Sequence, residues 1–316
     1  MSPKGTFDLV KRSLKSFSED DCPTMAAALS YYTVFALPPL LLLIVMIVGA
    51  VMDPQTVREA LHGQVGSLLG ESGGEAVRTI MEKAQETRTP DTSRPVAAVL
   101  GIGTLVLGAT GVFGQLQAAL NRAWKVKPDP KQGGIRNFLT KRIFSFGMVL
   151  AIAFLLLVSL ALTAAISAVG DAFGRLVPGL GEPLLHVLNF GVSFGIVTLL
   201  FGAMFKIVPD AEVAWRDVWV GAGVTAVLFV AGKFAIGFYL GRSNPGEAFG
   251  AAGSLAVLLV WIYYASMIVF FGAEFTQTWA ERRGAGVVPE EGAVRVVQEE
   301  KEVRGSEAAP SGRPGT

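Results

Sequence analysis

The sequence is dominated by long runs of apolar residues that carry few or no charges. A helix needs about 20 such residues to cross a hydrocarbon layer about 30 Å thick. Overall, 51% of the residues are hydrophobic, which is too high a share for a soluble domain of this length. We therefore predict an all-α polytopic membrane protein with six transmembrane helices near residues 25–51, 95–118, 143–168, 183–206, 217–240 and 250–279.

Basic residues are distributed unequally among the short connections between these runs. Short loops rich in Lys and Arg stay on the cytoplasmic side of a membrane. The third and fifth connections carry only Arg175 and Arg242, whereas the second connection carries Arg122, Lys125, Lys127, Lys131, Arg136, Lys141 and Arg142. The second connection is therefore predicted to be cytoplasmic. With six spans, both termini are then cytoplasmic as well, an N-in/C-in topology.

The spans divide the chain into three parts. We expect a cytoplasmic amphipathic leader at 1–24, a six-helix membrane domain at 25–283 with an outer loop at 52–94, and a flexible cytoplasmic tail at 284–316. The leader has apolar residues at helical spacing opposite lysines, the pattern of a helix that lies on an anionic membrane surface. An ordinary solvated leader is the alternative. The residues that form this pattern are Phe7, Val10, Leu14 and Phe17 on one face and Lys4, Lys11 and Lys15 on the other.

Four stretches of the sequence carry a resemblance to one family of membrane proteins. They are MAAALSYYTVFALPPLLLLIV at 25–45, GATGVFGQLQAALNRAWKV at 108–126, FKIVPDAEVAWRDVWVGA at 205–222 and GAAGSLAVLLVWIYYASMIVFFGAEF at 250–275. In this order they resemble the YihY or BrkB family, also labelled virulence factor and ribonuclease BN. The resemblance implies a bacterial inner-membrane protein with six helices and both termini in the cytoplasm.

The sequence does not supply the residues that hydrolysis of RNA requires. Its two histidines, His62 and His186, lie in separate segments without the spacing of metal ligands. Its one cysteine, Cys22, excludes an intramolecular disulfide. Cytoplasmic topology accounts for the basic loop without a nucleic acid. We therefore expect no enzyme activity, no metal or other cofactor and no nucleic-acid partner, with ribonuclease activity as a remote alternative.

One charged side chain, Lys233, lies inside the fifth predicted span, roughly 6 Å to the outer side of the midplane. A charge in hydrocarbon costs at least about 3 kcal/mol, so it requires a partner or a route to water. Polar residues recur at helical spacing in the outer halves of the neighbouring spans, which predicts a polar cavity beside Lys233. They are Ser159, Thr163 and Ser167 on the third span and His186, Asn189 and Ser193 on the fourth. The alternative is a lysine that snorkels to the membrane surface.

Two adjacent prolines, Pro38 and Pro39, lie near the middle of the first predicted span. Proline has no N–H group and its ring clashes with the preceding turn, so the pair is expected to kink or break the helix. Backbone groups freed at membrane depth are tolerated where they line a wet cavity, which makes this position a candidate hinge. A kink that serves packing alone is the alternative.

A second polar group gathers at the predicted cytoplasmic ends of spans four to six: Glu274, Lys206, Gln277, Asp210, Arg216 and Asp217. By depth in the membrane, Glu274 is placed to meet Lys206, with Gln277 one turn further along the same helix face. We expect an interfacial ion pair here. The other three residues belong to the connection FKIVPDAEVAWRD, whose Pro-Asp turn is expected to act as a structural clasp.

Together these patterns predict a protein that binds or translocates an anionic amphiphile or lipid in a cavity open toward the outer leaflet. Lys233 is the expected cationic contact, and membrane lipids are the expected partners. The alternative is a scaffold for envelope assembly that transports nothing, in which Lys233 and the proline pair are only structural. The sequence specifies neither a coupling ion nor an oligomeric state.

The predicted topology can be tested by cysteine labelling in a Cys22→Ser background. Cysteines introduced at Lys131 or in the C-terminal tail should resist an impermeant thiol reagent added outside intact cells, because both positions are expected in the cytoplasm. A cysteine at Ser72, in the outer loop, should react readily. Labelling at Lys131 or in the tail would overturn the orientation.

Overall fold

The computed structural model describes scattered positions between 53 and 108 together with residues 3–48, 111–129, 181–243, 253–283 and 286–296. Most of these residues are helical. The predicted span at 143–168, most of the span at 95–118 and most of the outer loop at 52–94 lie outside the described residues. Their expected structure stays a prediction.

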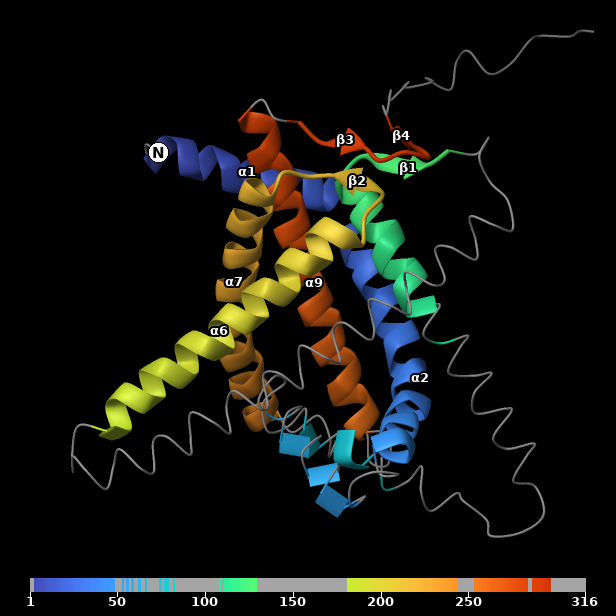
Figure 1. Cartoon of the computed structure of the whole chain (residues 1–316), viewed down its shortest axis with the longest axis vertical. Helices are drawn as coiled ribbons and strands as arrows, with labels where there is room; N and C mark the ends of the chain where they lie inside the picture. The colour runs from blue at the N-terminus through green and yellow to red at the C-terminus, as the bar shows by residue number, and fades with distance from the viewer. Residues whose placement is uncertain are drawn as a thin grey trace, which may run out of the picture.

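Five long helices form the body of the described structure (Figure 1): α1 (Pro3–Glu19), α2 (Cys22–Val48), α6 (Gly181–Ile207), α7 (Trp215–Ser243) and α9 (Gly253–Arg282). Helix α9 packs against α1, α2 and α7, and α6 packs against α7. In Figure 1, α2, α7 and α9 run lengthwise, α6 crosses them obliquely, and α1 lies across one end. We call this the α1 end.

The helical class of the protein is confirmed, and four of the predicted spans correspond to described helices. Helices α2, α6, α7 and α9 cover the first, fourth, fifth and sixth predicted spans. Within the described residues, three helices are long and apolar enough to cross a membrane, at Phe190–Ile207, Trp215–Tyr239 and Leu255–Arg282. The total of six spans and the orientation stay predictions.

Short strands join distant segments at the α1 end (Figure 1). β1 (Val126–Pro128) pairs antiparallel with β4 (Ala293–Arg295), and β2 (Ala211–Glu212) pairs antiparallel with β3 (Val288–Pro289). The expectation of one flexible tail at 284–316 is therefore wrong for residues 288–295. Periodicity did not reveal these strands because two or three residues are too few to show it, and their partners lie far away in the chain.

Helices α7 and α9 approach each other closely through two matched pairs of glycine and threonine. A Cβ added at Gly221 would lie 1.7 Å from Thr276 Oγ1, and one added at Gly272 would lie 1.9 Å from Thr225 Oγ1. Each threonine donates its hydroxyl hydrogen to the glycine carbonyl four residues earlier in its own helix, at 2.7 Å for Thr225 and 2.6 Å for Thr276. The polar atoms of this contact are therefore satisfied within each helix, and small residues let the backbones meet, as is typical of membrane helices.

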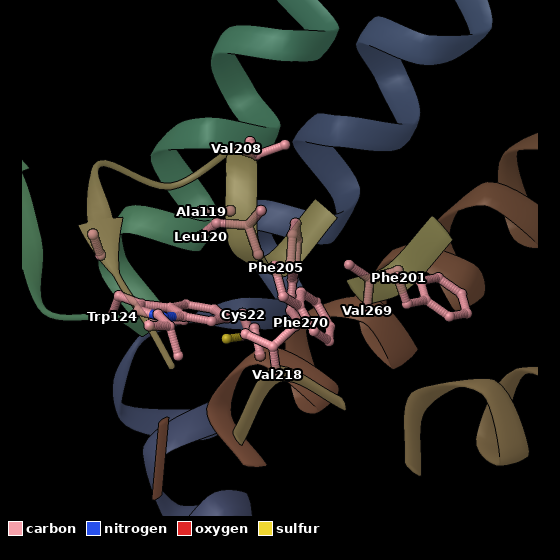
Figure 2. Close-up of a cluster of buried hydrophobic side chains, with 14 of the residues drawn as sticks. Cys22, Ala119, Leu120, Trp124, Phe201, Phe205, Val208, Val218, Val269 and Phe270 are labelled. Atoms are coloured by element: carbon pink, nitrogen blue, oxygen red, sulfur yellow. The ribbon is translucent and has the colours of Figure 1, made fainter. Parts of the chain in front are cut away.

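Two clusters of buried hydrophobic side chains hold the helices together. The larger cluster lies toward the α1 end, where Trp124 and Phe205 have ring centroids 5.8 Å apart and Phe270 packs beside them (Figure 2). The smaller cluster joins α2, α7 and α9 and includes Trp261. It also takes in Val77, so part of the predicted outer loop packs against these helices.

Helix α2 continues through Pro38 and Pro39 as one element, Cys22–Val48. The prolines therefore do not break the helix. Two backbone carbonyls, those of Val34 and Phe35, still lose their intrahelical donors, because proline has no N–H group. The prolines thus remove hydrogen bonds without ending the helix.

Helix α1 uses its faces differently from the simple amphipathic pattern. Leu9 and Ser13 are buried, whereas Phe7 and Leu14 are 71% and 53% exposed. Phe17, which the sequence pattern places on the same face as Phe7 and Leu14, packs edge-on against Phe271 of α9 at a centroid distance of 6.2 Å. One face of α1 therefore docks on α9, and a second apolar face remains exposed.

The close contact between α7 and α9 can be tested by adding one methyl group. Gly272→Ala should lower the melting temperature of the purified protein in detergent, because overpacking of this kind costs about 1–3 kcal/mol. Gly223→Ala on α7 is the matched control, since its added Cβ would meet no atom within 4 Å. The control should be neutral or stabilising, because alanine favours a helix by about 1 kcal/mol over glycine. Equal melting temperatures in the two variants would contradict the contact.

Candidate functional site

Four polar side chains from distant parts of the chain meet inside the α1 end. Asp20 lies in the turn between α1 and α2, Cys22 begins α2, Lys125 follows the helical residues 111–123, and Glu274 belongs to α9. Asp20, Cys22 and Glu274 are fully buried, and the Lys125 side chain is 29% exposed. We call these four residues the buried charged cluster.

Hydrogen bonds in the buried charged cluster leave two carboxyl oxygens unsatisfied. Lys125 Nζ forms an ion pair with Asp20 Oδ2. The Cys22 thiol donates to Glu274 Oε1 at 3.7 Å, and the Glu274 carboxyl also contacts Asp20. The remaining oxygens, Asp20 Oδ1 and Glu274 Oε2, are buried and receive no hydrogen bond from the described residues. Buried polar atoms without partners are uncommon in native proteins, so this pair requires an explanation.

The backbone on both sides of the Asp20–Lys125 ion pair adopts a left-handed conformation. Asp21 and Lys125 each have φ of 56°, a region that costs non-glycine residues roughly 1–2 kcal/mol. Thr24 donates its hydroxyl hydrogen to Asp21 Oδ1 at 2.9 Å. The Val296 N–H donates to the Lys125 carbonyl at 2.8 Å, so the segment after β4 holds the lysine backbone in place.

A second polar group, around Asp210, ties the connection after α6 to residues 111–123. Gln117 Nε2 and Asn121 Nδ2 donate to the two oxygens of Asp210 at 3.1 and 2.8 Å. The Asp210 N–H in turn donates to Asn121 Oδ1 at 2.7 Å. The Asp210 carbonyl accepts from the Glu290 N–H at 3.1 Å. Asp210 therefore links three segments: the connection after α6, the helical residues 111–123 and the segment after β3.

The expected ion pair between Glu274 and Lys206 is not formed. Lys206 Nζ donates instead to the Val213 carbonyl oxygen at 2.8 Å, while Glu274 lies against Cys22 and Asp20. Their predicted depths in the membrane are similar, which is why we expected the pair. Depth does not show in which direction each side chain points around its helix axis. The connection after α6 folds back beneath Lys206 and supplies an acceptor closer than α9.

The remaining polar residues of this end form peripheral links. Gln277 Nε2 donates to Glu281 Oε1 at 2.6 Å, and Glu281 also meets Arg295 of β4 at 3.8 Å. Asp217 is buried and lies 4.0 Å from Arg283. Arg216 is exposed. None of these three contacts brings its residues into the buried charged cluster.

Lys233 lies on a different part of α7, among exposed aromatic side chains. The lysine is half-buried, and its Nζ lies 6.0 Å from the centroid of the Phe234 ring. Phe234, Phe238 and Tyr239 are each about 60–70% exposed, at 68%, 61% and 59%. We call these four residues the Lys233 surface.

The other residues of the predicted polar cavity are only partly placed. Ser193 of α6 is exposed. His186 and Asn189 belong to α6, but their side chains lie outside the described part of the chain, as do Ser159 and Thr163 entirely. The cavity beside Lys233 therefore stays a prediction.

Sequence reasoning missed Asp20, Cys22 and Lys125 as members of one site. The stretch SEDD at 18–21 could have indicated this site, because burying a carboxylate next to a long apolar run costs free energy unless the carboxylate has a partner. The partners were not visible in the sequence because they lie far away along the chain. Asp20 and Lys125 are 105 residues apart, and Cys22 and Glu274 are 252 residues apart. Among the described residues, no group of three or more His, Cys, Asp or Glu side chains is arranged to hold a metal ion.

Comparisons with known proteins agree with the membrane character of the fold. The family model described as Virulence factor BrkB matches residues 13–295. A UPF0761 membrane protein of Pseudomonas paraeruginosa is 30% identical over 260 residues, which are 81% of this chain and 59% of the relative. UPF0761 membrane proteins of Rhodospirillum centenum and Alcanivorax borkumensis are both 28% identical, over 88% and 84% of this chain and 59% and 58% of their own lengths. The chain thus spans less than two thirds of these relatives, and no solved structure is significantly similar to it.

The clasp around Asp210 can be tested by removing one of its amide partners. Asn121→Ala should destabilise the protein by about 1–3 kcal/mol, because it leaves the part-buried Asp210 carboxylate and the Asp210 N–H with fewer partners. Arg122→Ala, at the exposed neighbouring position, is the control. Melting temperatures in detergent measure the difference. In a double-mutant cycle, Asn121→Ala and Asp210→Ala should be less than additive, and strict additivity would contradict the contact.

Proposed function

This chain belongs to the virulence factor BrkB family, and we propose that, as a member, it binds or translocates an anionic amphiphile or lipid. It is an integral membrane protein of that family, whose relatives are membrane proteins by name. The proposal concerns what the membrane domain contacts. It rests on one observation, the Lys233 surface.

The Lys233 surface combines one cation with a broad apolar area on a helix that is apolar and long enough to cross a membrane. Lys233 is half-buried, whereas Phe234 and Phe238, which follow it along α7, are more than half exposed. The aromatic rings offer contacts to hydrocarbon, and the ammonium offers a charge-assisted hydrogen bond to an anionic group. An anionic amphiphile or lipid has this pairing of groups.

The position of the Lys233 surface favours a ligand that enters from the membrane. Lys233 and its aromatic neighbours belong to the part of α7 remote from the α1 end (Figure 1). With the predicted N-in/C-in topology, that part of α7 lies in the outer half of the bilayer. A bound headgroup would then approach Lys233 from the outer leaflet. The inner membrane of a bacterium is the proposed location.

The proposal can be tested by separating the charge of Lys233 from its bulk. Lys233→Met keeps the stem and removes the ammonium, so retention of phosphatidylglycerol by the purified protein should fall about tenfold or more, with the melting temperature preserved. Lys233→Arg should keep part of the retention, because the charge remains while the shape changes. Lipid retained through purification is measured by mass spectrometry.

Arg242→Met is the matched control for charge. Arg242 lies in the last turn of the same helix, with its guanidinium 4.1 Å from the centroid of the Phe238 ring. Its loss should leave retention of phosphatidylglycerol close to that of the unmodified protein. If Lys233→Met retains as much phosphatidylglycerol as the unmodified protein, Lys233 does not bind the lipid headgroup. That result would favour the alternative, a scaffold in which the Lys233 side chain only extends to the membrane surface.

A further inference from the structure

We propose that Asp20 and Glu274 hold one exchangeable proton between them, which makes the buried charged cluster a proton-binding site. The site uses none of the residues of the Lys233 surface, so it stands apart from the proposed function. It is closed by the α1–α2 turn, by α9 and by the segment that carries Lys125.

Charge balance is the first reason for a proton here. Two carboxyl groups share one ammonium, so the buried charged cluster carries an uncompensated negative charge if both carboxyls are ionised. A buried charge without a counter-charge is strongly unfavourable, and a group in that position neutralises by taking up a proton. The Cys22 thiol, which donates to Glu274, adds no positive charge.

No other charged group of the described elements around Glu274 supplies the missing cation. From α7, Asp217 is directed to Arg283. From α6, Lys206 is bonded to the Val213 carbonyl. At the far end of α9, Arg282 donates to the Gly5 carbonyl of α1. Lys125 is thus the cation that meets the two carboxyls, and Asp20 Oδ2 already holds it.

Hydrogen bonding gives the second, independent reason. Asp20 Oδ1 and Glu274 Oε2 are the two buried oxygens of the cluster without a donor, and their carboxyl groups are in contact. Two carboxylates cannot bond to each other, because ionised carboxylates only accept. One proton converts the contact into an O–H···O⁻ hydrogen bond between the two carboxyl groups, which is among the strongest in proteins.

The ion pair decides which carboxyl carries the proton. Asp20 already holds the Lys125 ammonium, so the hydrogen is covalently bound to Glu274 and is donated to the Asp20 carboxylate. When the site empties, the proton passes to water or to a buffer base, and the cluster is left with a net charge of about −1. Water nearest to the cluster lies along the Lys125 side chain, which is 29% exposed. Proton occupancy thus removes a net charge that the three buried members of the cluster cannot compensate.

Infrared spectroscopy of the full-length protein in detergent tests the proposal directly. The unmodified protein at neutral pH should show the carbonyl stretch of a protonated carboxylic acid, and this band should vanish in Glu274→Gln. It should also vanish near neutral pH in Asp20→Asn, because one carboxyl and one ammonium then balance without a proton. Glu281→Gln, on the same helix but with a 47% exposed side chain, should keep the band.

Thermal unfolding as a function of pH gives a second measurement. The folded protein holds a proton that the unfolded chain releases, so the melting temperature should fall by roughly 2–4 °C per pH unit as the pH rises above about 4–5, where free carboxyl groups ionise. Glu274→Gln should lose this slope, since an amide carries no exchangeable charge, and Glu281→Gln should keep it. The absence of a protonated carboxyl band in the unmodified protein, or a band that survives both Glu274→Gln and Asp20→Asn, would overturn the proposal.

Discussion

The close contact between α7 and α9 sets the position of everything else at the α1 end. Gly221 and Gly272 leave no room for a side chain, and Thr225 and Thr276 bond to their own helices. The contact therefore depends on shape rather than on hydrogen bonds between helices, which suits a solvent where apolar surface gains nothing by leaving lipid. Glu274 lies between the glycine and the threonine of α9 in sequence, so the same contact fixes the depth at which its carboxyl enters the interior.

The two ends of the described structure differ in the surroundings of their polar groups. At the α1 end, connections that are far apart in the chain pair as β1 with β4 and β2 with β3, and Asp210 binds the side chains of residues 117 and 121. The paired strands and the contacts of Asp210 satisfy polar groups there with protein partners, whereas Asp20 Oδ1 and Glu274 Oε2 receive no hydrogen bond from the described residues. Toward the other end, α6 and α7 present exposed aromatic side chains and one half-buried lysine. The first arrangement favours a closed, ordered end, and the second favours contact with lipid.

The candidate sites were predicted to different degrees. Lys233 stood out because one charge in an apolar run is visible in a single segment. The pairing of Glu274 was predicted wrongly, because depth gives the level of a residue but not the direction of its side chain. Its observed neighbours, Cys22 and Asp20, sit 252 residues away from it or more, at the junction of a leader with the first span. Periodicity in one segment contains no information about such a neighbour.

The sequence by itself determined the membrane class, the family and the approximate bounds of α2, α6, α7 and α9, because a bilayer imposes one length and one polarity on every helix that crosses it. Tertiary structure alone decided that residues 288–289 and 293–295 form strands, that α2 continues through Pro38 and Pro39, and that Glu274 meets Asp20 rather than Lys206. These outcomes depend on which segments lie side by side. That choice is made by close packing and by the need of each buried polar atom for a partner, and both act between residues that are distant in the chain.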